Sequence, residues 1–241
     1  VIGQGGDLHY PYLTSDAFDN PWQDRFQTRY DFVVSELFID YLKANGDPRL
    51  PYMADGTAIS NGTEYVGLEY GLENPGVLET LLSGIDGRII YDGTQQGGWI
   101  VTYAEVCFAM AEANERGWTT VGDTLTWLKL GIQSSCERWG VPSASAASFA
   151  ASATLGSNPM ETIAMAKWTD MFLQGYEAWT EWRRLDFPVL SPPAAAITGV
   201  DVPVRNGYGG LVPTQNKASY DAAVAAQGPD NQDTKLWWDT K

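Results

Sequence analysis

Histidine and cysteine are scarce in this 241-residue chain, and their scarcity excludes several kinds of site. The single histidine, His9, leaves no histidine-based catalytic triad and no histidine-rich metal site. The two cysteines, Cys107 and Cys136, fall in neighbouring predicted helices. Antiparallel packing of these helices would offset the two residues by roughly 10 Å along the helix axis. Because a disulfide tolerates a Cα separation of only about 7 Å, we expect two buried free thiols.

Long apolar runs and clusters of basic residues are missing as well. No stretch reaches the ~18 consecutive apolar residues that suggest a membrane span. The 15 basic and 30 acidic residues give a formal net charge of −15. This charge argues against a nucleic acid or an anionic membrane surface as partner, because phosphate binding needs clustered Lys and Arg. The hydrophobic content of 44% is sufficient for a sizeable core in one large domain or two small ones.

The strongest local pattern in the sequence lies between Asn158 and Pro188. Asn158 can cap a helix, Pro159 suits its first position, and Glu161 can reach back to the cap. Apolar residues then recur every three or four positions, at Ala164, Trp168, Met171, Phe172, Gly175, Trp179 and Trp182. Pro188 must end the element. We predict one continuous helix whose tryptophan face packs into the core, in preference to a sugar-stacking platform.

The rest of the chain alternates between helical and turn-rich segments. Apolar spacing and stop signals predict helices over 30–44, 101–115, 123–139, 143–152 and 218–226. The second and third of these should form an antiparallel hairpin that turns near Trp118. Between Arg49 and Trp99 the dense turn signals predict long loops with short strands near Tyr65 and Ile89.

Four motifs, in the same order along the chain, resemble the SusD/RagB family of Bacteroidetes outer-membrane nutrient-binding lipoproteins. The first is the helix–turn signal Asp47-Pro48-Arg49-Leu50, and the second is the stretch 103–113 followed by Gly117-Trp118. The third is the tryptophan-rich stretch 167–184 before Pro188, and the fourth is the ending 231–239 with its paired tryptophans. Together they span the chain from about residue 20 to its end.

The resemblance implies a mainly α fold, in which tetratricopeptide-like helical hairpins form a scaffold and a long loop-rich region binds the ligand. It implies that 1–241 is the C-terminal portion of a single SusD-like domain. In this interpretation 1–100 is the loop-rich region, 101–190 contains the scaffold helices, and 191–241 is an extended C-terminal region. The N-terminal half of the same protein would complete the domain.

The same resemblance implies non-catalytic binding of glycans at the surface of the bacterial outer membrane. The bound glycan would be delivered to a SusC-like TonB-dependent transporter, and a lipid on a cysteine upstream of this chain would anchor the protein. Two alternatives remain open. One is a carboxylate-dependent glycosidase of helical-barrel type, and the other is a transporter lid that binds peptides.

The residues that would bind a glycan are predicted from residue type, because the family motifs lie in the scaffold. Sugars bind to exposed aromatic faces, with polar side chains beside them for the hydroxyl groups. The densest such group outside the predicted helices follows His9, and Asp16 lies within it. We predict a ligand-binding set of Tyr10, Tyr12, Trp22, Asp19 and Asn20. Weaker candidates are Tyr52, Tyr65, Tyr70 and Trp99.

Catalytic and cofactor sites are not predicted. Glu177 and Glu181 are one helical turn apart and could face one ligand, but an ion pair between Glu181 and Arg184 is favoured. The acidic stretches 16–19 and 230–233 offer oxygen ligands without the spacing of a calcium loop, so structural calcium is a minor alternative. We expect Trp237 and Trp238 to fasten the C-terminus to the scaffold.

Overall fold

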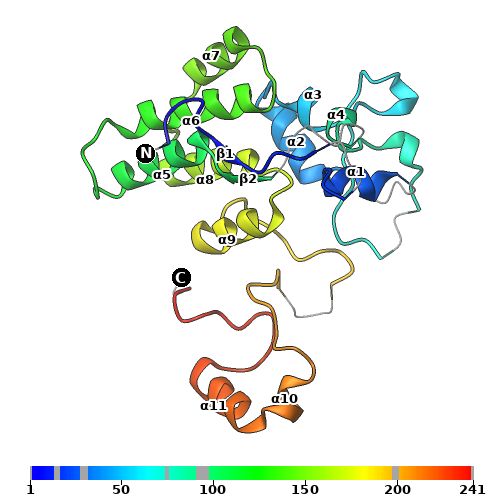
Figure 1. Ribbon diagram of the computed structural model, residues 1–241, viewed down its shortest axis with the longest axis vertical. Helices are drawn as coiled ribbons and strands as arrows, with labels where there is room; N and C mark the ends of the chain where they lie inside the picture. Colours follow the sequence, from blue (N-terminus) through cyan, green and yellow to red (C-terminus); the bar gives the residue numbers. More distant parts are fainter. Residues whose placement is uncertain are drawn as a thin grey trace.

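The computed structural model describes residues 2–13, 17–27, 32–73, 76–90, 98–196 and 201–239. Helices dominate these residues, and β1 (Leu8–His9) and β2 (Trp99–Val101) form a short antiparallel sheet beside them (Figure 1). The predicted mainly α class with a helical-hairpin scaffold is confirmed. None of the helices in the described ranges is long and apolar enough to cross a membrane.

The scaffold is built on the predicted hairpin of α5 (Tyr103–Glu115) and α6 (Thr124–Arg138). Side-chain oxygens of Thr102 and Asp123 cap these helices by accepting backbone N–H groups at 3.0 and 2.9 Å. α5 begins two residues later than predicted because Val101 belongs to β2. α7 (Ser143–Ser152) packs on α6, and α8 (Pro159–Asp170) packs on α5 (Figure 1).

The predicted continuous helix before Pro188 is wrong, because the chain breaks it into two helices. α8 ends at Asp170, α9 spans Gly175–Leu185, and Leu173 between them has a left-handed φ of 66°. The break turns the Phe172 ring onto that of Phe38, with ring centroids 4.8 Å apart. Packing against a distant helix therefore overrides the local helical periodicity. Trp168, on the α8 side of the break, packs into the core as predicted.

A second core lies beneath α2 (Glu36–Ala44), α3 (Leu50–Met53) and α4 (Gly87–Ile90). The predicted helix over 30–44 begins only at Glu36, since Val33 pairs with Gly84 as an isolated bridge; residues 30 and 31 lie outside the described ranges. The predicted strand near Ile89 is wrong, because this fully buried residue lies in α4. Near Tyr65 the described chain forms no strand. α1 (Pro21–Phe26) precedes α2, and the 3₁₀ turns η1 (Ala58–Ser60) and η2 (Glu79–Leu81) lie between α3 and α4.

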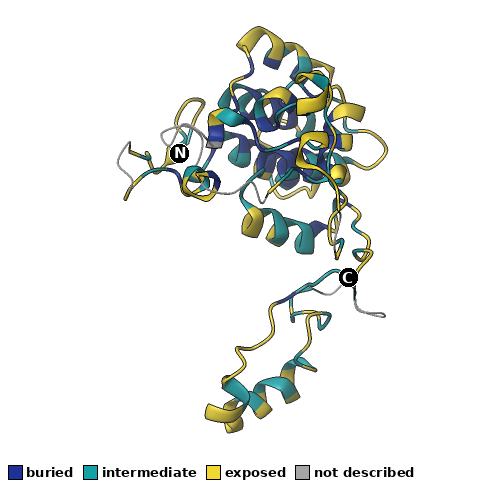
Figure 2. Ribbon diagram, turned by 90° about the vertical axis from the view of Figure 1, so that its right-hand side faces the viewer, coloured by how far each residue is buried: buried dark blue, intermediate teal, exposed yellow. Residues whose placement is uncertain are grey.

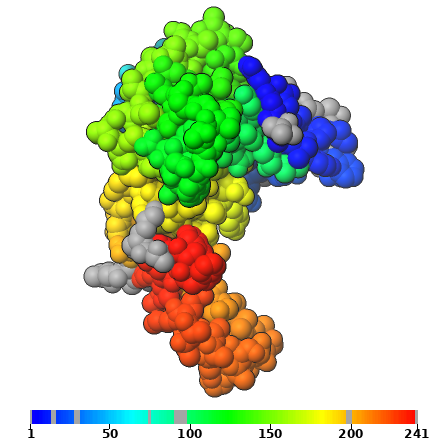
Figure 3. Space-filling view, turned by 90° about the vertical axis from the view of Figure 1, so that its left-hand side faces the viewer, coloured from blue at the N-terminus to red at the C-terminus, as the bar shows by residue number. Residues whose placement is uncertain are grey.

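The C-terminal residues 201–239 form an extension that projects from the helical body (Figures 2 and 3). It carries α10 (Val212–Gln215), which was not predicted, and α11 (Lys217–Gln227), which was. The indole of Trp179 in α9 holds its base by donating to the carbonyl of Pro203 at 2.8 Å. Trp237 is 85% exposed, so the expectation that it fastens the C-terminus is wrong. Trp238 does contact α9, since the guanidinium of Arg183 lies 5.2 Å from its ring.

The two cysteines are buried free thiols, as predicted. Burial raises the pKa of the Cys107 thiol to about 11 and that of Cys136 to about 12. Both are therefore protonated at neutral pH, as is typical of structural cysteines.

Candidate functional site

Three residues of the predicted ligand-binding set meet around one small cavity. The cavity has a volume of about 140 Å³. Its lining consists of Tyr12, Asn20, Trp22, Gly98, Trp99, Trp139, Phe172, Leu173 and Gln174. We call it the aromatic cavity, because five of these nine residues have aromatic rings.

The first wall of the aromatic cavity comes from the start of α1. The side-chain oxygen of Asn20 accepts the backbone N–H of Trp22 at 3.0 Å, and Pro21 occupies the first helical position. Asn20 is completely buried, and its amide also donates to the carbonyl of Ile89 at 3.5 Å. The cap fixes the start of α1, and with it the position of Trp22.

The second wall is made by the pairing of β1 with β2. His9 lies opposite Trp99 in this pairing, and the backbone N–H of Tyr10 donates to the carbonyl of Gly98 at 2.7 Å. Gly98 has a φ of 60°, and a Cβ atom there would lie 2.7 Å from the carbonyl oxygen of Tyr10. The close approach therefore requires glycine. It brings the chain leading to Tyr12 beside Trp99.

The third wall is the break between α8 and α9. The left-handed Leu173 places Phe172, Leu173 and Gln174 along the cavity. Trp139 follows α6 as its C-cap residue, and its ring centroid lies 5.8 Å from that of Phe172. The departure from the predicted continuous helix thus forms part of the site.

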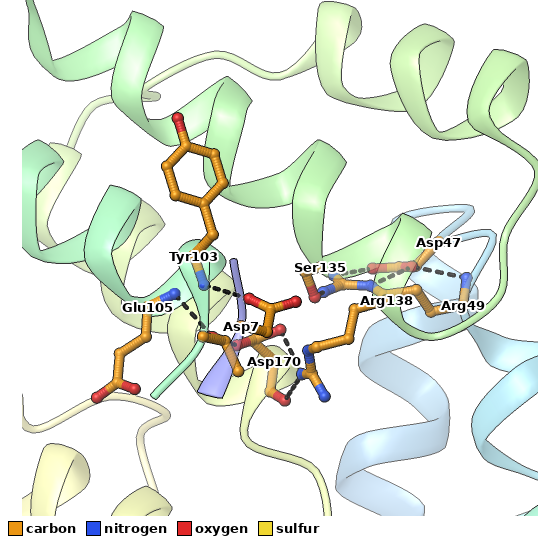
Figure 4. Close-up of polar contacts among 9 residues, drawn as sticks. Asp7, Asp47, Arg49, Tyr103, Glu105, Ser135, Arg138 and Asp170 are labelled. Carbon is orange, nitrogen blue, oxygen red and sulfur yellow. Dashed lines mark hydrogen bonds and ion pairs between the residues drawn. The ribbon is translucent and has the colours of Figure 1, made fainter. Parts of the chain in front are cut away.

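Two of the tryptophans that line the aromatic cavity have buried indole N–H groups. Within the part of the chain that the structure describes, the buried Nε1 atoms of Trp99 and Trp139 reach no acceptor. The guanidinium of Arg138 lies 5.0 Å from each of these two rings, a distance at which cation–π attraction operates. The carboxylate of Asp170 holds this guanidinium by accepting from it at 2.7 Å (Figure 4). The positive charge beside the cavity is therefore balanced.

The remaining predicted residues lie around the cavity or away from it. Tyr10 is 52% exposed, and its ring centroid lies 6.0 Å from that of Tyr12, but it does not line the cavity. Asp19 is half-buried and also lies outside the lining. Asp16 falls outside the described residues. Contact of any of these residues with a ligand stays a prediction.

The weaker candidates have different positions. Trp99 lines the aromatic cavity, and its ring centroid lies 5.0 Å from that of His9. Tyr70 anchors a loop by donating its hydroxyl to the carbonyl of Ser191 at 2.6 Å. Arg88 covers the ring of Tyr52 at 4.5 Å, and Tyr65 packs against the second core. Of the four, only Trp99 joins the site.

Sequence reasoning missed Trp139 and Gln174 as members of the site. Trp139 has the apolar spacing of the helix that it terminates, and Gln174 fell within a predicted helix. Neither position carries a local signal of binding. The sequence did show an unusual density of tryptophan, but we interpreted its helical spacing as core packing.

A larger apolar groove adjoins the aromatic cavity and has a volume of about 330 Å³. Trp22, Phe172 and Leu173 line both hollows, and the groove extends from Phe32 to Ala178. Trp22 therefore stands where the two hollows meet.

The paired acids of α9 are engaged in the scaffold. Glu181 accepts from Arg184 at 2.6 Å, as predicted, and forms a second ion pair with Lys167 at 3.0 Å. Glu177 is exposed on the same helix. In the described ranges no three His, Cys, Asp or Glu side chains form a group that could hold a metal ion. That the protein works without a cofactor stays a prediction.

Solved structures with a similar fold include proteins of known binding type. A chitin-binding protein has a TM-score of 0.85 and 26% identity, covering all of this chain and 57% of its own. A chitin-binding SusD homologue from Flavobacterium johnsoniae has a TM-score of 0.76 and 22% identity, covering 55% of its own chain. A SusD homologue from Bacteroides fragilis NCTC 9343 has a TM-score of 0.84 and 21% identity, covering 59% of its own chain. The present chain thus spans less than two thirds of the length of each.

The sequence comparisons point to the same family. None of the curated proteins matches the sequence. A SusD-like family model, described as "Starch-binding associating with outer membrane", matches residues 4–209. Since this match covers most of the chain, the protein belongs to the SusD-like family.

Proposed function

We propose that this protein captures glycans at the surface of the bacterial outer membrane without cleaving them. Membership of a family described as starch-binding and outer-membrane associated is the observation that carries the proposal. The chitin-binding activity named for two similar structures supports a glycan as the ligand. The described chain adds a cavity with aromatic walls and the polar side chain of Gln174 in its lining, which are features that sugar binding needs.

The sugar lies against Trp22, between the aromatic cavity and the apolar groove. An indole face attracts the C–H surface of a pyranose ring, and the neighbouring polar groups bond its hydroxyls. The net charge of −15 suits a neutral glycan better than a phosphorylated ligand. Because Trp22 lines both the aromatic cavity and the apolar groove, a sugar bound against it lies close to residues of each.

Delivery to a SusC-like TonB-dependent transporter follows capture. A lipid on a cysteine upstream of this chain keeps the protein at the membrane, and the N-terminal half of the same protein completes the domain. The family description supports the membrane association. The ion pairs of Glu181 with Lys167 and Arg184 support binding without hydrolysis, since a glycosidase needs two carboxyl groups facing the scissile bond.

Calorimetric titration of the full-length protein with starch and chitin oligosaccharides tests this proposal. We expect binding without release of smaller products, and at least about tenfold weaker binding for Trp22→Ala. Tyr12→Ala provides a second test that leaves α1 intact. The matched control Trp118→Ala alters a tryptophan that is 72% exposed at the far end of α5, and should bind normally.

Three results would overturn the proposal. One is the absence of binding to every glycan, and another is binding to peptides in place of glycans. The third is hydrolysis of a glycan that is lost when a paired acid is changed. The last two would favour the transporter lid for peptides and the carboxylate-dependent glycosidase, respectively.

A further inference from the structure

Three asparagines in this chain are followed directly by glycine: Asn45, Asn61 and Asn206. Such a pair is chemically labile, because the backbone nitrogen of the glycine can attack the side-chain amide of the asparagine. Glycine has no Cβ atom to hinder this approach, and its backbone reaches conformations that other residues avoid. All three asparagines are exposed to solvent, as are the glycines that follow them. Exposure therefore does not distinguish the three pairs, whereas their hydrogen bonds do.

Asn45 is protected by the end of α2, where it is the C-cap residue. Its side-chain amide, the group that would be attacked, donates to the carbonyl of Tyr41 at 2.8 Å. The N–H of Gly46, which would attack, donates to the carbonyl of Lys43 at 3.1 Å. Reaction at this pair requires both hydrogen bonds to break, and hence local opening of the helix end.

Asn61 is protected by the turn that follows η1. Its backbone is left-handed, with a φ of 53°, and the N–H of Gly62 donates to the carbonyl of Thr57 at 3.0 Å. A hydrogen bond of 2.8 Å between the hydroxyls of Thr57 and Ser60 holds the same turn. The nitrogen that would attack is therefore engaged here as well.

The third pair, Asn206-Gly207, lies in the segment before α10. Among the described residues, the N–H of Gly207 and the side chain of Asn206 have no hydrogen-bond partner. The buried guanidinium of Arg205 donates from Nε to the backbone carbonyl of Asn206 at 3.1 Å. This carbonyl belongs to the same peptide group as the N–H of Gly207, so the cation makes that N–H more acidic. The attacking nitrogen is thus both free and activated.

We infer that Asn206 is a modification site, at which the side-chain amide is lost in a reaction that needs only water. The backbone nitrogen of Gly207 forms a bond to Cγ of Asn206 and gives up its proton. The side-chain nitrogen takes this proton and leaves as ammonia, which produces a cyclic imide. Water then opens the imide at one carbonyl to give aspartate, or at the other to give isoaspartate. No electrons are transferred in either step.

The modification changes the segment that holds α11, a helix with no buried residue. Arg205 and the backbone N–H of Tyr208 both donate to Oδ1 of Asp230, at 3.2 and 3.1 Å. The hydroxyl of Tyr220 in α11 donates to the other carboxylate oxygen of Asp230 at 3.2 Å. An aspartate at position 206 adds a negative charge to the segment that binds this carboxylate, and an isoaspartate lengthens its backbone by a methylene group. Both products weaken the attachment of α11.

Tryptic peptide mapping of the full-length protein, after warm storage at slightly alkaline pH, measures the loss of each amide by mass. We expect Asn206 to react at least about fivefold faster than Asn45 and Asn61, the factor by which one hydrogen bond slows the other two. In denaturing urea the three sites should react at similar rates, because these hydrogen bonds are gone.

Gly207→Ala provides the matched variant. An added Cβ atom would lie 3.5 Å from Oδ1 of Asp230, an ordinary contact, so the variant should fold normally. It should slow the reaction of Asn206 by at least about fivefold and leave that of Asn61 unchanged. Amide hydrogen exchange in α11 should become faster when the unsubstituted protein is stored, and stay the same when Gly207→Ala is stored.

Four results would contradict these expectations. Reaction at Asn206 no faster than at Asn45 and Asn61, an excess at Asn206 that persists in urea, or an unchanged rate in Gly207→Ala would overturn the modification site. Unchanged hydrogen exchange in α11 of the modified protein would overturn its effect on this helix. Glycan binding enters none of these measurements, so the proposed function stands or falls separately.

Discussion

In the scaffold helices α5–α9, buried charged side chains have charged partners, whereas in the aromatic cavity two buried indole donors reach no acceptor among the described residues. Asp170 and Arg138 are paired with side chains only 4% and 2% exposed, and Glu112 binds both Arg116 and Arg184. Trp99 and Trp139 line the cavity, and their buried indole N–H groups reach no acceptor in the part of the chain that the structure describes. A buried charge that is paired contributes to a stable, unique packing, whereas a buried N–H group without an acceptor costs stability.

Arg138 connects the two regions. Its guanidinium donates to Asp170 in α8 (Figure 4). It also lies 5.0 Å from the rings of both Trp99 and Trp139. A second buried pair, Asp47 with Arg49, lies nearby, where Arg49 also donates to the hydroxyl of Ser135 at 2.7 Å. The scaffold thus holds Arg138 in place beside two of the tryptophans that line the cavity.

Removal of the carboxylate beside Arg138 should produce the largest effect. Asp170→Ala removes the carboxylate paired with the buried guanidinium of Arg138, and we expect the free energy of unfolding to fall by about 3–5 kcal/mol. Urea denaturation followed by circular dichroism measures this loss. Glycan affinity should fall too, because Arg138 is no longer held between the two tryptophan rings.

An exposed ion pair provides the control for Asp170→Ala. Lys217 and Asp221 in α11 pair at 2.8 Å, but their side chains are 72% and 53% exposed. Asp221→Ala should change the free energy of unfolding by less than about 1 kcal/mol. Equal losses of unfolding free energy in the two variants would show that a buried scaffold ion pair contributes no more to stability than an exposed pair does.

Overpacking the scaffold should lower stability without reaching the cavity. Gly131 in α6 faces α5 so closely that an added Cβ would lie 2.5 Å from a ring carbon of the fully buried Phe108. We expect Gly131→Ala to lower the free energy of unfolding by about 1–3 kcal/mol, although alanine favours helices. Thermal melting measures the change, and the glycan affinity of the folded protein should stay the same.

Gly175→Ala is the matched control, because nothing lies within 4 Å of an added Cβ there. It should be neutral or slightly stabilising. A loss as large as that of Gly131→Ala would contradict the packing argument.

A pH dependence should separate two glutamates of α5. Burial opposes ionisation of Glu112, but hydrogen bonds and charges from Arg184 and Arg116 outweigh it and hold its pKa below the ordinary 4.5. The stability from ionised Glu112 is complete above pH 4.5 and is lost as the pH falls through the lowered pKa. Glu112→Gln should therefore cost about 1–3 kcal/mol at pH 7, from the lost charge-assisted hydrogen bonds, and less in acid. Denaturation at pH 7 and pH 3 measures both values; an equal loss would argue against this origin.

Glu105 should show the smallest effect, with the opposite sign. Desolvation raises the pKa of its carboxyl above 4.5, although the charge of Lys167 opposes the rise. The folded protein therefore binds this proton more tightly than the unfolded chain, and stability is lost as the pH rises through the raised pKa. Glu105→Gln should stabilise the protein slightly at pH 7 and leave it unchanged in acid. Destabilisation at pH 7 would show that the ionised form is favoured.

Much of the scaffold could be predicted because its signals are local. The caps Thr102, Asp123 and Asn158 bond to backbone N–H groups within three residues of themselves, and the hairpin follows from apolar spacing. The prediction of one continuous helix before Pro188 was wrong because it, too, rested on local signals alone. Its break at Leu173 depends on Phe38, which is distant in the sequence.

The candidate site could be predicted in part. Tyr12, Asn20 and Trp22 are close in the sequence, so residue type alone grouped them. Trp139 and Gln174 reach the same cavity from the ends of separate helices, where spacing indicated only core packing. Lys167 and Asp170 fall outside the apolar spacing of the tryptophan-rich segment, yet both are buried in ion pairs.

By itself the sequence determined the mainly α class, the α5–α6 hairpin, the unpaired thiols and the resemblance to the family. These depend on interactions within a few helical turns or on motifs read in order. Only the tertiary structure decided where the tryptophan-rich segment breaks into two helices. It also decided which buried indole N–H groups have no acceptor among the described residues. Those outcomes depend on packing between segments far apart in the chain, where the burial of Phe172 against Phe38 outweighs a local preference for helix.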